Sequence, residues 1–250
     1  MQRFHKIGII TYQSPHLKTE QVLNSFLLND SAGGGSRGGG GGGLGGGGGG
    51  GGGDLCLYAL PFVSREERAV LFSHRPKQSE AISAKEIAAK WNLKYQECAS
   101  DAEIPNECDI YVITGCGILS QECLKGKKVL NAHPGIIPNS RGLDSFKWAI
   151  LEDRPLGVTL HYINEEVDSG EIVAVMPTQV YESDTLHTLA RRHYENEIAL
   201  IANFKYHLQN PSNPYDEIPQ MQSTKRMKPI EEKEMMNHFE AYRQKWQCNE

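Results

Sequence analysis

Residues Lys6–Tyr12 read Lys-Ile-Gly-Ile-Ile-Thr-Tyr, a short apolar run suited to a buried parallel strand. Ser14-Pro15 interrupts this run, and apolar side chains then recur at helical spacing between Thr19 and Asn29. The chain therefore opens with a strand, a turn and a helix.

The same alternation continues along the chain. Further strands are predicted at 55–60, 69–72, 109–114, 128–131, 157–164 and 171–178. Helices are predicted from the capping box Ser83-Ala84-Lys85-Glu86, over 143–152, and from an Asp184 cap to about Leu208. This order predicts an α/β fold: a mostly parallel twisted sheet with helices on both faces, Rossmann-like. Ligands of such sheets bind at the carboxyl ends of the strands.

The predicted domain organisation is one catalytic domain over 1–210 and a C-terminal extension over 211–250. Within 33–53, 18 of 21 residues are glycine. Such a tract buries no side chains while ordering each residue costs about 1–2 kcal/mol, so we expect a flexible insertion. A glycine loop that cradles phosphate is disfavoured, because no Lys-Ser/Thr pair follows the tract.

Composition and charge exclude several classes of protein. The formal charge of -5 argues against nucleic acid as a partner, because counterion release requires clustered Lys and Arg. No apolar run of about 18 residues predicts a membrane span, and Met1 to Tyr12 does not resemble a signal peptide. The six cysteines form no Cys-x-x-Cys pair or zinc-site spacing and are expected to be reduced thiols. A cytoplasmic protein is expected, with its oligomeric state open and a homodimer among the alternatives.

A polar pair falls where the predicted strand 128–131 ends. Asn131 and His133 are two apart, so they face the same side of an extended chain, and Pro134 keeps His133 extended. A carboxamide and an imidazole at a strand end can hold a carbonyl oxygen and move a proton. The alternative is a strand end with a hydrogen-bonded histidine and no chemistry.

A second segment favours the chemical interpretation. The predicted strand 157–164 leads to Asp168, in a turn that Gly170 makes accessible. A carboxylate there could orient the imidazole of His133 and stabilise its charged form. An Asp-Ser-Gly turn by itself is more often structural.

Together these residues resemble the folate-dependent formyltransferase family, which includes glycinamide ribonucleotide transformylase, methionyl-tRNA formyltransferase and the nucleotide-sugar N-formyltransferases. The resemblance is strongest from 109 to 178, and Gly115-Cys116-Gly117-Ile118-Leu119 is similar to the loop around the folate pterin. Gly135 stands where the family has a small hydroxyl residue, which puts one hydrogen bond of the site in doubt. The matching positions are Asn131, His133, Pro134, Pro138, Arg141, Gly142, Gly157, Thr159, His161, Asp168 and Gly170.

The resemblance implies a mechanism. An amine attacks the formyl carbon of 10-formyltetrahydrofolate, and Asn131 and His133 stabilise the developing oxyanion while Asp168 orients His133. His133 also passes a proton to the leaving folate nitrogen. The resemblance further implies that the folate contacts Gly117, Leu119, Asn164 and Val167, and that no metal is needed.

The motif sequences are most similar to those of the enzymes that formylate nucleotide-linked amino sugars, such as dTDP- or UDP-amino deoxysugars. Glycinamide ribonucleotide transformylase is the next alternative, but its Gly-x-Gly phosphate turn is replaced by Thr11-Tyr12-Gln13-Ser14-Pro15. His74-Arg75-Pro76-Lys77 is a candidate for contact with the folate or with phosphates, or else an exposed basic turn. A tRNA substrate is disfavoured, because 211–250 is too short for a tRNA-binding domain. A folate- or nucleotide-binding module without catalysis also stays open.

Overall fold

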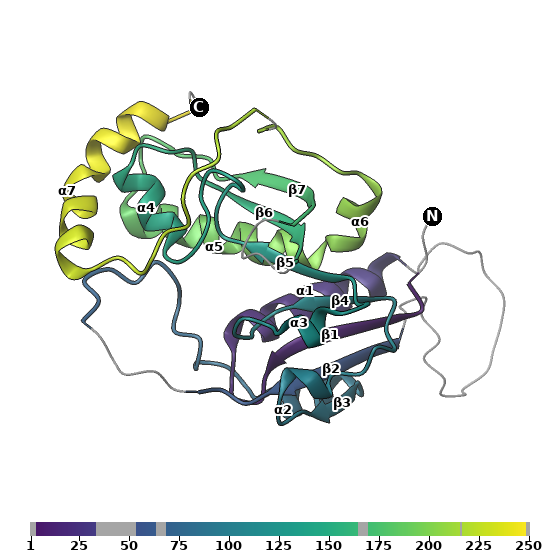
Figure 1. Cartoon of the computed structure of the whole chain (residues 1–250). Helices are drawn as coiled ribbons and strands as arrows, with labels where there is room; N and C mark the ends of the chain where they lie inside the picture. The colour runs from purple at the N-terminus through teal and green to yellow at the C-terminus, as the bar shows by residue number, and fades with distance from the viewer. Residues whose placement is uncertain (1–3, 34–53, 64–68, 165–169, 216, 249–250) are drawn as a thin grey trace, which may run out of the picture.

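The computed structural model describes residues 4–33, 54–63, 69–164, 170–215 and 217–248. Within them, seven strands form one sheet in the order β3-β2-β1-β4-β5-β6-β7 (Figure 1). The strands are β1 (Lys6–Tyr12), β2 (Asp54–Leu60), β3 (Lys94–Glu97), β4 (Ile110–Ile113), β5 (Val129–His133), β6 (Gly157–Tyr162) and β7 (Ile172–Pro177). The helices are α1 (Leu17–Gly33), α2 (Ala84–Trp91), α3 (Gln121–Leu124), α4 (Ser145–Leu151), α5 (Leu186–Ala202), α6 (Phe204–Gln209) and α7 (Pro229–Trp246).

The sheet is parallel from β3 to β5 and antiparallel beyond. β1 pairs in parallel with both β2 and β4, and β4 pairs in parallel with β5. β6 then runs antiparallel to β5 and to β7. The predicted α/β fold with a mostly parallel sheet is therefore confirmed. β1 and β4 are neighbours in the sheet although β2 and β3 lie between them in the chain, which makes their carboxyl ends the switch point where ligands of such sheets bind.

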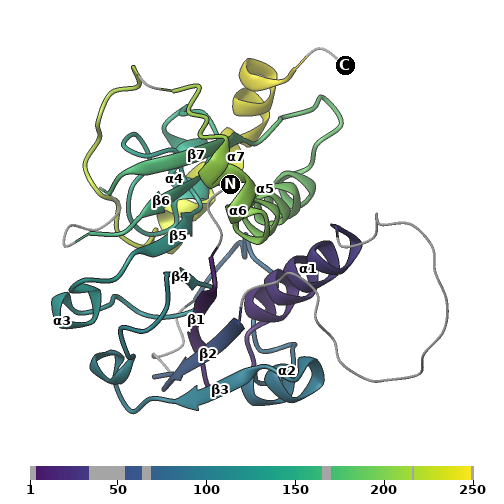
Figure 2. The same ribbon diagram turned by 90° about the vertical axis from the view of Figure 1, so that its right-hand side faces the viewer.

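Helices cover both faces of the sheet, as predicted. Alternate strand residues such as Ile7 and Ile9 pack in one core with α1, α2 and α5, while Ile10 belongs to a core on the opposite face with Cys123 of α3. Figure 2 shows α1, α2 and α5 on one side of the strands and α3 on the other. None of the helices that the structure describes is long and apolar enough to cross a membrane.

The C-terminal residues pack on the rest of the chain. Met235, Phe239 and Tyr242 of α7 are buried in a third core with Phe146 and Ile150 of α4. Figure 1 shows α7 beside α4 at one end of the molecule. The C-terminal extension over 211–250 therefore shares a hydrophobic core with α4 of the predicted catalytic domain.

Two local predictions were wrong. Residues 69–72 form no strand. Instead the Leu71 amide donates to Glu232 Oε2 of α7 (2.6 Å), and Phe72 is buried in the core of α4 and α7. The helix expected to run from an Asp184 cap to Leu208 begins after Thr185, whose hydroxyl accepts from the Thr188 amide, and it is broken at Asn203 between α5 and α6.

The insertion predicted over 33–53 lies outside the described residues, apart from Gly33 at the end of α1. Asp168 and Val167 of the predicted site also lie outside them.

Candidate active site

Strand β5 carries Asn131 and His133 to the carboxyl edge of the sheet. In the antiparallel register with β6, Asn131 lies opposite His161 and His133 lies opposite Thr159. His161 is buried and its Nδ1 hydrogen-bonds the Tyr162 carbonyl (3.1 Å). Asn131 is half-buried, and its side chain makes no hydrogen bond within the described part of the chain. Its carboxamide can therefore donate to a ligand.

The turn after β5 folds back and fixes one nitrogen of His133. The ring Nε2 lies 2.7 Å from the Ser140 carbonyl oxygen and 3.2 Å from Ser145 Oγ. A carbonyl oxygen can only accept, so Nε2 carries the proton in this arrangement. In the neutral ring, Nδ1 is then the nitrogen that can take up a proton.

Gly135 permits this close approach. A Cβ at Gly135 would collide with the Ser140 carbonyl oxygen and lie 2.8 Å from His133 Nε2. Thr159 holds the same turn, because its Oγ1 donates to the Gly135 carbonyl (2.7 Å) and accepts from the Ile137 amide (3.1 Å). Ser140 and Ser145 can therefore contact the imidazole only because residue 135 has no side chain. Neither serine was predicted from the sequence to belong to the site.

The residues expected to contact the folate lie in two places. Gly117 and Leu119 follow β4, at the same edge of the sheet as His133. Leu119 is buried and holds the loop, whereas Ile118 is 88% exposed and no atom lies within 4 Å of a Cβ built on Gly117. Asn164 follows Ile163, whose amide donates to the Val129 carbonyl (2.9 Å) at the opposite end of β5.

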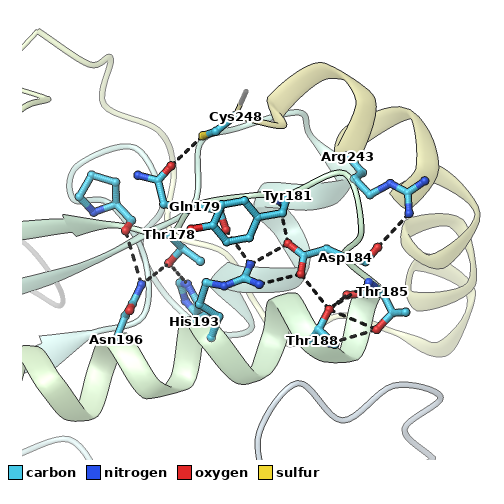
Figure 3. A network of polar contacts seen from close by, with 12 residues as sticks. Thr178, Gln179, Tyr181, Asp184, Thr185, Thr188, His193, Asn196, Arg243 and Cys248 are labelled. Atoms are coloured by element: carbon cyan, nitrogen blue, oxygen red, sulfur yellow. Dashed lines mark hydrogen bonds and ion pairs between the residues drawn. The ribbon is translucent and has the colours of Figure 1, made fainter. Parts of the chain in front are cut away.

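A third buried histidine, after His133 and His161, lies behind the motif. His193 of α5 contacts the Pro134 carbonyl through Nε2 (3.3 Å) and Thr178 Oγ1 through Nδ1 (2.9 Å). Asn196 donates to the same hydroxyl (3.2 Å), and Figure 3 shows the three side chains meeting at the end of β7. These bonds tie α5 and β7 to the residue that follows His133. His193 was not predicted from the sequence, although its position on the buried stripe of a long helix was a detectable signal.

Two buried charges and one half-buried charge meet between α1, α5 and the 73–76 loop. Glu197 of α5 contacts Lys18 Nζ through one carboxylate oxygen and Arg75 Nη2 through the other, each at 2.6 Å. Burial raises the pKa of Glu197, but Arg75 and Lys18 outweigh it and lower this pKa to about 2. The carboxylate therefore fixes Arg75, one of the basic residues singled out from the sequence.

Residues 68–203, more than half of the chain, match the family model described as formyl transferase, and the chain belongs to this family. Phosphoribosylglycinamide formyltransferase of Haemophilus influenzae is 37% identical over 71 residues, which are 28% of this chain and 34% of that protein. The chain spans about a third of the length of the curated relatives that it matches first.

Solved structures agree in fold. A sugar N-formyltransferase from a Shewanella species has a TM-score of 0.57 at 15% identity, covering 94% of this chain and 87% of that one. Phosphoribosylglycinamide formyltransferase from Bacillus halodurans has a TM-score of 0.52 at 18% identity, covering 82% and 94%. At these identities the likeness concerns the fold.

The buried histidines predict a loss of stability in mild acid. Burial lowers the pKa of His193 from 6.5 to about 4, and burial followed by Lys18 lowers the pKa of His16 to about 4. The unfolded chain therefore takes up protons between pH 6.5 and 4 that the folded chain does not, and stability falls as the pH falls. For His193 the expected loss by pH 4 is about 3 kcal/mol.

Urea unfolding at pH 7, 5 and 4 checks this prediction. His193→Gln should lose less stability across the range than the wild type, because glutamine does not titrate. His5→Gln removes a histidine from an exposed position and serves as the control. An equal pH dependence for His193→Gln and the wild type would contradict the prediction.

Proposed function

We propose that this chain transfers a formyl group from 10-formyltetrahydrofolate to the amine of a nucleotide-linked amino sugar. The observation that carries the formyl transfer is the geometry of His133 and Asn131. The Nε2–H of His133 donates to the Ser140 carbonyl, and Asn131 precedes His133 by two residues on the same strand. Acyl transfer to an amine requires a group that moves a proton and a donor that stabilises the oxyanion. The imidazole of His133, with its fixed tautomer, and the carboxamide of Asn131 meet these two requirements.

The two side chains have different proposed roles. Asn131 donates its amide N–H to the formyl oxygen as negative charge develops on that oxygen. His133 takes a proton from the attacking amine at Nδ1 and returns it to the folate nitrogen as the bond between that nitrogen and the formyl carbon breaks, while the Nε2–H bond to Ser140 keeps the ring in place. Asp168 is proposed to orient His133.

Gly117, Leu119, Asn164 and Val167 are proposed to hold the folate, which supplies the formyl carbon. The loop around Gly117 fits this role, because Leu119 is anchored in the core while open space adjoins Gly117. Backbone groups of such a loop can reach the polar edge of a flat heterocycle without interference from a side chain.

A cavity of about 780 Å³ supports a large acceptor. It lies between α1, α5 and the 73–76 loop, with Ala190, Tyr194 and Ile198 giving it an apolar wall. His74, also in its lining, stacks on Phe146 with ring centroids 5.8 Å apart and planes at 7°. An aromatic ring and an apolar wall suit the base of a nucleotide, which glycinamide ribonucleotide lacks.

Hydrogen-bond donors line the same cavity. Gln21 Oε1 accepts from Tyr194 OH (2.9 Å) and Asn24 Oδ1 accepts from Trp91 Nε1 (3.1 Å). These bonds fix both carboxamides, whose nitrogens make no hydrogen bond within the described residues. Arg75, 31% exposed, adds a guanidinium held by Glu197. An acceptor-rich diphosphate complements this lining.

The cavity is connected to the motif through packed rings. Phe146 contacts the ring of His74 on one side and that of His193 on another, with centroids 5.8 and 5.2 Å apart. His193 in turn contacts the Pro134 carbonyl. An acceptor in this cavity would thus contact His74, which is linked through Phe146 and His193 to Pro134, the residue after His133.

Glycinamide ribonucleotide remains the alternative acceptor, favoured by the sequence identity with phosphoribosylglycinamide formyltransferases. The turn after β1 argues against it. The His16 ring packs against Gly115, within 2.6 Å of where a Cβ would lie, and Lys18 is bound by Glu197. Both side chains closely follow Tyr12–Pro15, which stand in place of the phosphate turn, and both are held by other parts of the chain.

A side-by-side assay tests the substrate class. The protein is incubated with 10-formyltetrahydrofolate and dTDP- or UDP-amino sugars or glycinamide ribonucleotide, and products are identified by mass. We expect an amino sugar to be formylated with a kcat/KM of about 10³ M⁻¹s⁻¹ or better, and glycinamide ribonucleotide far more slowly. A preference for glycinamide ribonucleotide would move the assignment to purine synthesis.

The Arg75→Met variant locates the acceptor. We expect it to raise KM for the nucleotide sugar about tenfold or more, with a smaller effect on kcat, because it removes a contact made before the reaction. Lys77→Met is the control, since Lys77 is an exposed cation two residues away. Equal effects of the two variants would place the acceptor elsewhere.

A further inference from the structure

Part of the C-terminal region lies against the turn that holds His133. Residues 219–228, which we call the strap, lie outside the family match and end where α7 begins. The Met221 amide donates to the Pro138 carbonyl (3.2 Å), and Asn139 Nδ2 donates to the Pro219 carbonyl (3.3 Å). The strap thus contacts the turn at Pro138 and at Asn139.

Thr224 makes the densest set of these contacts. Its amide donates to the Arg141 carbonyl and its carbonyl accepts from the Leu143 amide, both at 3.0 Å. Its hydroxyl lies 2.9 Å from the Arg141 carbonyl oxygen and 2.8 Å from that of Leu143. One strap residue therefore fixes both neighbours of Gly142.

Gly142 is shaped by this contact. Its φ is 90°, and a Cβ there would collide with the Thr224 carbonyl oxygen. The glycine of the Arg-Gly pair is thus required by the approach of the strap as well as by its backbone conformation.

Two bonds connect this region to the imidazole. Ser145 Oγ donates to the Gly142 carbonyl (3.0 Å) and lies 3.2 Å from His133 Nε2. The Ser140 carbonyl, immediately before Arg141, accepts from the same nitrogen. The acceptors that fix His133 therefore belong to the loop that Thr224 holds.

The strap is itself anchored. The Met227 amide donates to Asp144 Oδ2 (3.0 Å), and Trp148 Nε1 donates to the Lys225 carbonyl (2.7 Å). The Met227 side chain is buried in the core of α4 and α7. Displacement of the strap would require these contacts to break as well.

We propose that Thr224 is a positioning residue for catalysis, which holds the 140–145 loop so that His133 keeps its proton on Nε2 and works through Nδ1. This inference rests on the proposed function of His133. It gives the C-terminal region a role in the chemistry in addition to its packing.

Thr224→Val is the first test, because it removes the hydroxyl and keeps the branched shape and the backbone bonds. We expect kcat to fall about tenfold or more, since small misplacements of a catalytic group are costly, with KM for the acceptor within about twofold. Thr224→Ser, which keeps the hydroxyl, should have a kcat close to that of the wild type. Gln222→Ala, at an exposed strap residue with no hydrogen bond among the described residues, is the control.

Nitrogen-15 NMR of the His133 ring gives a readout independent of turnover. The wild type should show the Nε2–H tautomer, and Thr224→Val a mixture of tautomers. Gly142→Ala, which forces the strap away, should give the same change if the valine variant folds poorly. Wild-type kcat or an unchanged tautomer in well-folded Thr224→Val would overturn the proposal. Absence of formyl transfer by the wild type would instead refute the proposed function, and the NMR comparison would still test the strap.

Discussion

Replacement of His133 by alanine should lower kcat at least about 100-fold while leaving the fold intact, because the variant loses its proton-transfer group. Asn131→Ala and Asp168→Asn should have effects of similar size for the loss of an oxyanion donor and of an orienting carboxylate. Because the three residues act as a unit, double variants should lose far less than the product of the single losses. Formyl transfer measured by mass, with circular dichroism as the check on folding, gives the result.

His238→Ala is the matched control for this experiment. His238 is half-exposed on α7, where its Nε2 contacts Asp153 Oδ1 (3.1 Å). Its loss should leave kcat unchanged. A fully active His133→Ala protein would rule out the proposed mechanism, whatever the acceptor proves to be.

Glu232→Ala should lower the free energy of unfolding by about 3–5 kcal/mol, the usual effect of removing one partner of a buried ion pair. Glu232 Oε1 lies 2.5 Å from Lys147 Nζ, and the two side chains are 0% and 2% exposed. The other carboxylate oxygen accepts from the Leu71 amide. The variant leaves a buried ammonium and a backbone N–H without their partner. Urea unfolding at neutral pH measures the loss.

The exposed pair Lys77–Glu80 provides the comparison, with side chains 73% and 71% exposed and a separation of 3.9 Å. Glu80→Ala should cost less than about 1 kcal/mol. The double variant Lys147→Met with Glu232→Leu should recover most of the stability, because it removes both charges together. Similar losses for Glu232→Ala and Glu80→Ala would show that burial of the pair contributes nothing.

Apolar periodicity predicted most of the sheet, because buried strands such as β1 and β4 are apolar on both faces. It missed β3, whose sequence Lys-Tyr-Gln-Glu reads as a surface segment because this strand lies at the edge of the sheet. It gave 69–72 as a strand, because an apolar run does not reveal that Leu71 bonds a carboxylate on a helix far along the chain. It also missed α7, although Met235, Phe239 and Tyr242 recur at helical spacing.

For the candidate site, local pattern predicted the pair that shares a strand. Asn131 and His133 follow from the alternation of side chains along β5. Ser140 and Ser145 do not, because their contacts with His133 depend on how the turn folds back. Thr224 lies still further from any sequence signal, since its role comes from an approach between segments about eighty residues apart. The roles of Asp168 and of the folate-contacting residues stay predictions.

β1 lies in the middle of the sheet, so a fragment of this chain that can fold must include it. The family match begins at residue 68, whereas β1 and β2 precede it and β1 pairs with β4. A fragment trimmed to the matched residues would leave β4, with its sequence Ile-Tyr-Val-Ile, as an uncovered edge, and would take from β3 the strand it pairs with. Exposed apolar edge strands can pair with other chains and lead to aggregation. Expression, isotope labelling and mutational scanning of this protein therefore need the first sixty residues as much as the catalytic motif.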